Sequence, residues 1–372
     1  MDWLPSDLHD AVLLGRLALP DGPTPVIIRH GIVHDMAQVA PTVSMLIEQD
    51  CLGKAGVELG RVDQVLERHR PLSPIDLQCV KAAGVTFARS TLERVIEERA
   101  RGDAAAAAAI RARLEGVVGV GIRTVRPGSA EAAALKDALI ADGLWSQYLE
   151  VAIGPDAEIF TKAPILSTIG ADGEIGVRSD SRWNNPEPEI VLVADSKGRA
   201  VGATLGNDVN LRDFEGRSAL LLGKAKDNNA SGALGPFVRL FDAAFSMDDI
   251  RTADLSLTIA GEDGYALRGS SSMREISRDP LELLRQAMSE HQYPDGLVLF
   301  LGTLFAPTED RDVPGQGFTH KRGDVVTIGW PRLGRLRNRV TTCAAAPPWS
   351  FGVGELIKNL AERGLLRSKE AS

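Results

Sequence analysis

The first 70 residues alternate between short apolar runs and turn-forming residues. The runs 11–19 and 24–36 are rich in Val, Ile and Leu and meet at a turn that contains Pro and Gly, which is typical of paired β-strands. Segment 42–49 instead has apolar residues at helical spacing, and it begins with Thr42, a residue type that favours helix N-termini. This pattern predicts a small mixed unit of strands and helices.

Residues 71–118 begin as an extended segment and end as a long helix in this pattern. Opposite charges recur three and four residues apart in segment 92–100, as on an exposed helix face, and the alanines of 104–109 form helix readily. We therefore expect a helix in a solvated outer layer or at a subunit contact. Segment 84–90 indicates a second role, because its Gly, Phe and Arg at a strand-to-helix junction could line a pocket for an anionic substrate.

The pattern changes near residue 150. Residues 119–150 continue as helix with a break at Gly143, whereas short apolar strands separated by Gly, Pro, Asn and Asp turns follow over residues 151–340. Within that region, helical spacing is confined to residues 279–291. A last helix with a charged end is predicted over residues 352–372.

The length and the change of pattern together predict two domains. A chain of 372 residues is long enough for both. We predict an α+β protein with an N-terminal α/β domain over residues 1–148 and a β-rich catalytic domain over residues 149–372.

Charge and cysteine content exclude several classes of protein. The net charge of -8 provides no basic surface for nucleic acid. No apolar run has the length of a membrane span, and the acidic N-terminus lacks the regions of a signal peptide. Cys51, Cys79 and Cys343 are few and far apart, which excludes a cysteine-based zinc site and suits a reducing compartment. We expect a cytoplasmic protein that binds neither nucleic acid nor membranes.

Three acidic residues stand out among the apolar strands of the second half. Glu187 and Glu189 lead into the apolar run 190–193, and because strand side chains alternate between faces, both carboxylates point the same way, about 7 Å apart. Asp208 ends the next strand and could complete a set of three. A cation would remove their repulsion, and all-oxygen ligands favour Mg²⁺, with Mn²⁺ or Ca²⁺ as alternatives. The bland alternative is that these acids lie on solvated strand ends.

These acids belong to a longer set of motifs. In chain order the motifs are PEPEIVLV (186–193), GNDVNLRD (206–213), AKDNNASGALGP (225–236), LFLGTLFAP (299–307) and KRGDVVTIGWPRLGRLRNRV (321–340). Together they resemble the signature of the fumarylacetoacetate hydrolase superfamily over roughly residues 150–342. The resemblance implies a mixed β-sheet roll, with Glu187, Glu189 and Asp208 as the metal ligands.

The same resemblance assigns a lysine and a threonine to the site. Lys226 takes the position of the family lysine, on a loop before Gly235-Pro236, and Lys224 is the competing choice. Thr303 matches the threonine that contacts the substrate carboxylate. The resemblance also implies a homodimer or a homotetramer.

Within the superfamily, the closer likeness is to 2-keto-3-deoxy-pentonate dehydratases. It rests on the segments GVTFARSTLERVIEE (84–98), AEIFTKA (157–163) and VRSDSRWNNPEPE (177–189). It implies Mg²⁺-dependent dehydration of a 2-oxo sugar acid, a 2-keto-3-deoxy-pentonate, to 2-oxoglutarate semialdehyde. Glu158 and Lys226 would then serve as acid and base in either order, and the D-xylose, D-arabinose and L-arabinose pathways all stay open.

Two other functions compete with this interpretation. One is C–C hydrolysis of a diketo acid, such as an acylpyruvate or a 2,4-diketo-3-deoxy sugar acid, for which hydrolases of this superfamily use a His-Glu pair. The chain has no histidine between His69 and His291, although His30, His34 or His69 could reach the site from the N-terminal domain. The other is a non-catalytic sugar-acid binder, which the filled motif positions disfavour.

Polar residues near the acids are weaker candidates. Asp180 and Ser181, with Arg178, could hydrogen-bond substrate hydroxyls or could simply form a turn. Arg212 and Asp213 are expected to form a structural pair that supports Asp208.

Overall fold

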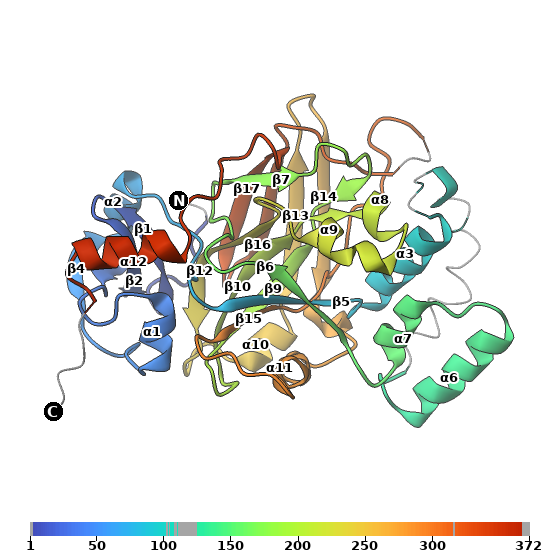
Figure 1. The fold of residues 1–372 in the computed structure, drawn as a ribbon, viewed down its shortest axis with the longest axis horizontal. Helices are drawn as coiled ribbons and strands as arrows, with labels where there is room; N and C mark the ends of the chain where they lie inside the picture. Colours follow the sequence, from blue (N-terminus) through green and yellow to red (C-terminus); the bar gives the residue numbers. More distant parts are fainter. Residues whose placement is uncertain are drawn as a thin grey trace.

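A large mixed sheet forms the body of the protein (Figure 1). The computed structural model describes residues 3–101, 103, 105–107, 110, 125–314 and 317–366. In spatial order the strands of the ten-stranded sheet are β4 (Val57–Arg61), β3 (Ile32–Asp35), β2 (Gly22–Arg29), β1 (Leu13–Leu19), β12 (Gly232–Leu240), β10 (Ala200–Asp208), β9 (Pro188–Ala194), β15 (Leu297–Phe300), β5 (Cys79–Gly84) and β6 (Glu158–Ala163). Strands from both sides of the predicted boundary near residue 148 share this sheet, and the boundary itself stays a prediction.

A smaller sheet packs against the large one. Its strands, in order, are β14 (Ala266–Ser272), β13 (Asp254–Ala260), β16 (Val325–Trp330), β17 (Gly334–Thr342) and β7 (Glu174–Val177). A two-stranded ribbon joins β11 (Asn210–Leu211) to β8 (Asn184–Asn185). Most pairs are antiparallel, but β15 runs parallel to β5 and β17 runs parallel to β7. The expected α+β architecture with mixed sheets is confirmed.

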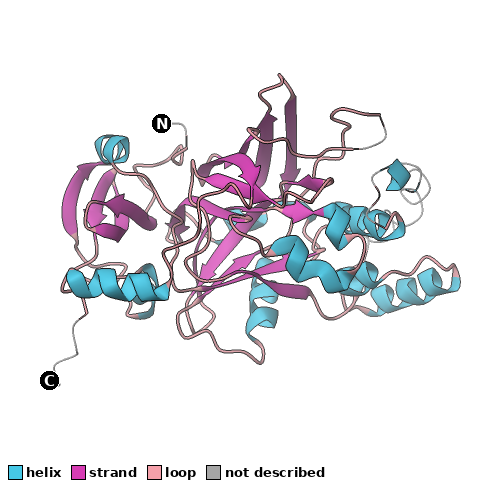
Figure 2. Ribbon diagram, turned by 45° about the horizontal axis from the view of Figure 1, so that its top comes forward, coloured by secondary structure: helices cyan, strands magenta, loops and turns pink. Residues whose placement is uncertain are grey.

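The burial of strand β9 explains why residues 190–193 form one continuous apolar run. Ile190 and Leu192 pack in the core cluster that includes Leu257 of β13, whereas Val191 and Val193 pack in a second cluster on the other face. A strand buried on both faces has no solvent side, so its sequence does not alternate. Figure 2 shows the strands concentrated in the middle of the molecule and in the N-terminal unit.

Two groups of helices lie at opposite ends of the large sheet. α1 (Val43–Glu48), α2 (Val62–Arg68) and α12 (Val353–Glu362) accompany the N-terminal strands in Figure 1, and α3 (Ala88–Arg99), α6 (Ala130–Ala141) and α7 (Gln147–Ile153) lie together at the opposite end. α8 (Arg212–Glu215), α9 (Leu222–Lys226), α10 (Met247–Arg251) and α11 (Pro280–Met288) connect the strands between them. The short helices α8, α9 and α10 were not predicted, because four or five residues are too few to show helical spacing.

Several predicted elements are confirmed. Thr42 caps α1 by accepting a hydrogen bond from the Met45 amide, and Gly143 separates α6 from α7 with a positive φ of 65°. The helices α11 and α12 lie in the predicted segments, although residues 367–372 of the C-terminal segment lie outside the described residues.

The helix at residues 88–99 departs from the expectation in two ways. It ends at Arg99, and Arg101 has a left-handed φ of 53°, so no single helix continues into the alanine run. Residues 105–107 of that run are helical, and its other residues lie outside the described part. α3 is also not a solvated outer helix, because Val95 and Ile96 pack with Tyr148 of α7 in a buried cluster. Among the described residues, no helix has the length and apolarity to cross a membrane.

Candidate active site and metal centre

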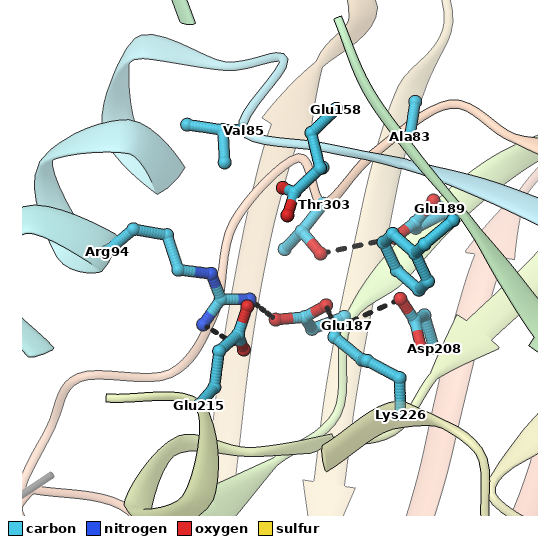
Figure 3. Close-up of a pocket in the computed structure, with 12 residues that line it drawn as sticks. Ala83, Val85, Arg94, Glu158, Glu187, Glu189, Asp208, Glu215, Lys226 and Thr303 are labelled. Atoms are coloured by element: carbon cyan, nitrogen blue, oxygen red, sulfur yellow. Dashed lines mark hydrogen bonds and ion pairs between the residues drawn. The ribbon is translucent and has the colours of Figure 1, made fainter. Parts of the chain in front are cut away.

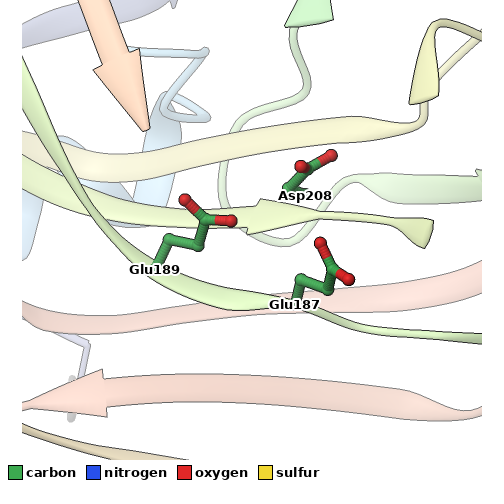
Figure 4. A group of neighbouring side chains, drawn as sticks. All are labelled: Glu187, Glu189 and Asp208. Carbon is green, nitrogen blue, oxygen red and sulfur yellow. The ribbon is translucent and has the colours of Figure 1, made fainter. Parts of the chain in front are cut away.

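The three acids predicted as ligands converge where β9 begins and β10 ends. The antiparallel register pairs Pro188 with Asn207, and the Asp208 amide donates a 3.0 Å hydrogen bond to the Glu187 carbonyl. Oxygen atoms of Glu187, Glu189 and Asp208 all lie within 4.8 Å of one another, and the three side chains are buried (Figure 4). The strand pairing thus unites carboxylates that are about twenty residues apart in sequence.

Two lysines hold this set of carboxylates from one side. Lys226 Nζ lies 2.5 Å from Glu187 Oε2 and 3.0 Å from Asp208 Oδ2. Lys162 Nζ lies 2.6 Å from Asp208 Oδ1 and also donates a short hydrogen bond to the Lys226 carbonyl. Lys162 therefore fixes both the acid Asp208 and the end of the helix that carries Lys226.

The loop after β15 holds Glu189 from the other side. The Gly302 amide donates to Glu189 Oε2 over 2.7 Å, and the Thr303 hydroxyl donates to Glu189 Oε1 over 3.2 Å. Gly302 has a φ of 101°, and a Cβ atom there would lie 2.0 Å from Thr86 Oγ1. Only glycine fits this turn, which places Thr303 beside the acids.

Glu158 enters from the edge strand β6. It pairs in register with Gly84 of β5, and a Cβ atom at position 84 would lie 1.9 Å from Glu158 Oε2. The missing side chain of Gly84 thus makes room for the Glu158 carboxylate. Lys162, four residues further along β6, pairs with Asp208 and not with Glu158.

A buried arginine, Arg94, and a further glutamate, Glu215, complete the site. Arg94 of α3 lies 2.5 Å from Glu187, 2.6 Å from Glu97 and 3.0 Å from Glu215, the last residue of α8. Figure 3 shows Arg94 and Glu215 on one side of Glu187, with Asp208 and Glu189 on the other. Neither residue was predicted: the charges of α3 resembled an exposed face, and α8 is too short to show helical spacing. Gly84 and Val85 of segment 84–90 line the site, whereas the side chains of residues 88–90, with the Arg of that prediction, lie outside the described part.

These side chains line a narrow cavity whose solvent-accessible volume is about 10 Å³, the space of about one water molecule. Its lining is mostly polar and consists of Ala83, Gly84, Val85, Arg94, Glu158, Phe160, Glu187, Glu189, Asp208, Glu215, Lys226 and Thr303. Within the described residues, which include all six histidines, neither histidine nor cysteine lines it.

The cavity and its ion-pair partners carry an excess of acid. The carboxylates are Glu97, Glu158, Glu187, Glu189, Asp208 and Glu215, and the cations are Arg94, Lys162, Arg212 and Lys226. Among the described side chains, six carboxylates against four cations leave a formal charge of -2 in this buried place. We call these ten residues the acid-rich cluster.

The pKa shifts follow from this excess. Burial, reinforced by Asp208 and Glu187, raises the pKa of Glu189 well above its usual range. Burial also raises the pKa of Glu158, and it raises the pKa of Glu215 to about 7 although Arg94 acts in the opposite direction. Burial alone would lower the pKa of Lys226, but Asp208 and Glu187 hold it above its ordinary value. Glu187 differs from these three acids: burial acts to raise its pKa, but Lys226 and Arg94 lower it to about 2.

A divalent cation fits the acid-rich cluster. Glu187, Glu189 and Asp208 present only carboxylate oxygens, which is the ligand chemistry of Mg²⁺ and Ca²⁺ rather than of softer metals. A charge of +2 would also offset the formal excess. The three acids could thus bind a metal ion, with Lys226 and Thr303 beside it.

Comparison with known proteins identifies the family. The family described as fumarylacetoacetate (FAA) hydrolase C-terminal matches residues 136–341, a little over half of the chain. The chain belongs to this family.

Curated members of similar sequence include two sugar-acid enzymes. The chain is 32% identical over 182 residues to 2-dehydro-3-deoxy-D-arabinonate dehydratase of Saccharolobus solfataricus, covering 48% of this chain and 57% of the relative. It is 32% identical over 195 residues to a probable 2-keto-3-deoxyxylonate dehydratase of Haloferax volcanii, covering 52% of this chain and 64% of the relative. The matches thus span less than two thirds of either relative.

A solved structure shares the fold. A 2-keto-3-deoxy-D-arabinonate dehydratase complexed with magnesium and 2,5-dioxopentanoate aligns with a TM-score of 0.62, at 21% identity, over 89% of this chain and 99% of that one. At this identity the likeness shows the fumarylacetoacetate hydrolase fold alone.

The remaining predicted residues lie outside the cavity. Lys224 is exposed, with its Nζ 5.2 Å from the centre of the Phe214 ring, whereas Lys226 is buried at the end of α9 and not on a loop. Asp180 pairs with Arg178 on the surface, and Ser181 donates a 2.8 Å hydrogen bond to Asp213. These partners engage both side chains away from the cavity, so we leave Asp180 and Ser181 out of the proposed site.

The expected pair of Arg212 and Asp213 is wrong. Arg212 lies 3.0 Å from Glu97 and donates a 3.0 Å hydrogen bond to the Pro307 carbonyl. Asp213 instead accepts from Ser181 and from the Arg182 amide. Consecutive residues point in different directions, so each supports a different neighbour of the site.

Proposed function

We propose that this fumarylacetoacetate hydrolase family member is a Mg²⁺-dependent hydro-lyase that dehydrates a 2-keto-3-deoxy-pentonate to 2-oxoglutarate semialdehyde. The main support is the buried cavity, where three carboxylates meet Glu158, Lys226 and Thr303 and which none of the described histidines lines. The names of the two curated relatives point to the same class of substrate.

We assign the metal and the carboxylate end of the substrate to one wall of the cavity. Glu187, Glu189 and Asp208 would hold the ion, which supplies Lewis-acid stabilisation of an enolate when it is bound. Thr303 lies against Glu189, and its hydroxyl is suited to a substrate carboxylate oxygen beside the ion. Lys226 adds a positive charge at the same wall.

The proposed reaction needs one base, one acid and no oxidant. Glu158 takes a proton from C3, because its carboxylate faces the cavity without an ion-pair partner among the described residues. The C4–O bond then breaks, and Lys226 donates the proton with which the hydroxyl leaves as water. The resulting 3-ene loses one proton from C5 and one from the C5 hydroxyl, and it gains one proton at C3 and one at C4 as its enols tautomerise. C5 thus becomes an aldehyde without any net redox change.

The competing hydrolysis of a diketo acid has less support. It requires a base that activates water, and the His-Glu pair expected for that role has no histidine at the cavity. His320 is bonded to Asp324, and His30 to the His9 carbonyl, so neither reaches the site.

The direct test is turnover of the pentonate. Purified protein is incubated with each C4 enantiomer of 2-keto-3-deoxy-pentonate, the D form that D-arabinose and D-xylose both give and the L form that L-arabinose gives, each with Mg²⁺ or with EDTA. We expect semialdehyde, detected by coupled NAD(P)⁺ reduction, only with Mg²⁺. Cleavage of an acylpyruvate without dehydration of any pentonate would reject the proposal. A homodimer or homotetramer and a cytoplasmic location remain part of the proposal, and sedimentation would test the first.

A further inference from the structure

One buried ion pair of the cavity has no role in the proposed reaction. Arg94 Nη1 lies 3.0 Å from Glu215 Oε2, and both residues line the cavity. They stand on the opposite side of Glu187 from Asp208 and Glu189 (Figure 3). A short acid whose carboxylate end lies at the three ligands and Thr303 would therefore extend toward Arg94 and Glu215.

The pair is held rigidly in place. Arg94 also donates a hydrogen bond to Glu97 Oε2, and Arg212 lies 3.0 Å from the other carboxylate oxygen of Glu97. Arg212 in turn donates to the Pro307 carbonyl and begins α8, the helix that ends at Glu215. Both members are thus fixed by their own helices before any ligand arrives, and preorganised groups lose little freedom on binding.

The two groups have complementary hydrogen-bonding chemistry. A guanidinium only donates and a carboxylate only accepts, whereas a hydroxyl does both and can bridge them. A methyl group at the same place would exclude water from the pair and return no hydrogen bond. The cavity offers few other contacts to an apolar tail, since its lining contains only Ala83, Val85 and Phe160 as apolar side chains among the described residues.

We propose that Arg94 and Glu215 bind the distal hydroxyl of the substrate and make the cavity selective for hydroxylated 2-oxo acids over 2-oxo acids with an apolar tail. The inference rests on the proposed function for the placement of the carboxylate end. It adds the element that distinguishes a sugar acid from an aliphatic acid of equal length.

Binding of two matched ligands tests this selectivity without turnover. The ligands are 5-hydroxy-2-oxopentanoate and 2-oxopentanoate, which differ by one hydroxyl and carry no leaving group at C4. In calorimetric titrations with Mg²⁺ present, we expect the wild-type protein to bind the hydroxylated acid about 10- to 100-fold more tightly. This ratio should fall to about threefold or less in Glu215→Gln and in Arg94→Lys, which keep the size of the side chains.

Arg99→Lys is the matched control. It makes the same exchange on α3, but Arg99 reaches the Gly143 carbonyl at the surface and should leave the ratio unchanged. Equal affinity of the wild-type protein for both ligands, or a ratio that survives in a folded Glu215→Gln or Arg94→Lys variant, would overturn the inference. Selective binding without dehydration of any pentonate would instead reject only the proposed reaction.

Discussion

Two buried clusters of charge in this protein serve different ends. One is the acid-rich cluster, and the other joins Arg311, His320 and Asp324 within the segment that connects β15 to β16. Arg311 binds Asp324 through two contacts of 2.5 Å and 2.7 Å, and its guanidinium lies 4.5 Å from the centre of the Tyr265 ring. Asp324 accepts two more hydrogen bonds, from the Lys321 amide and from His320.

The difference between the clusters is their charge balance. Among the fully buried side chains of the second cluster, one cation, Arg311, meets one carboxylate, Asp324, and the partly exposed Asp263 adds a longer contact to Arg311 at 3.3 Å. The contacts of Asp324 hold its pKa well below its usual range although burial acts to raise it. At the acid-rich cluster, Glu158 and Glu189 have no ion-pair partner among the described residues, and burial raises several pKa values. A balanced buried pair holds the fold, whereas an unbalanced one beside a cavity indicates a binding site.

The largest effect on activity is expected at Lys226, which contacts the proposed metal ligands Glu187 and Asp208. Lys226→Met should lower kcat about 10²- to 10⁴-fold in the dehydration assay, because it removes the proposed proton donor. Lys224→Met is the matched control and should stay within about threefold, since Lys224 lies outside the cavity. Loss of activity at Lys224 alone would reverse the assignment.

A substitution in the cluster of Arg311 and Asp324 should instead lower the stability of the fold. Asp324→Asn should lower the free energy of unfolding at pH 7 by about 3–5 kcal/mol in urea titrations, because it removes the buried counter-charge of Arg311 and leaves it only the partly exposed Asp263. Glu189→Gln should not destabilise the metal-free protein, since Gln resembles the protonated carboxyl that the raised pKa favours. Equal losses in both variants would remove the distinction between the clusters.

Low pH should reduce the difference in unfolding free energy between the wild-type protein and Asp324→Asn. The folded pKa of Asp324 is lowered, so its ionised form stabilises the protein above the unfolded pKa of about 3.9 and loses this contribution as the pH falls toward the folded value. The difference in unfolding free energy between the two proteins should thus be full at pH 6 and smaller at pH 3. A gap that stays constant would show that Asp324 stabilises through shape rather than charge.

The smallest effects are expected at the surface turn. Asp180→Asn and Ser181→Ala should change kcat by less than about twofold and stability by about 0.5 kcal/mol, as is usual for exposed positions. A tenfold change in KM at either residue would return it to the substrate site.

The sequence predicted those parts of the site that lie on single strands. Strand alternation and the motifs predicted that Glu187, Glu189 and Asp208 form one group. Local patterns predicted β1, β2 and the N-cap at Thr42. Arg94 could not be found in this way, because its pairing with Glu97 is the same three-residue spacing that an exposed helix shows, and only the packing of Val95 and Ile96 against α7 buries it.

The partners of consecutive polar residues were equally hidden. Arg212 and Asp213 carry opposite charges, but the turn into α8 sends them to Glu97 and to Ser181. Local sequence does not encode such directions, which depend on the relative positions of α3, α8 and the loop that carries Pro307.

Metal binding tests the account most directly. Mg²⁺ is titrated calorimetrically into metal-free wild-type protein and into Glu189→Gln, without substrate. We expect one ion per chain for the wild type and a loss of binding in the variant, because the substitution removes one ligand carboxylate and, with it, one of the two excess negative charges. Absence of Mg²⁺ binding by the folded wild-type protein, or unchanged affinity in Glu189→Gln, would contradict it.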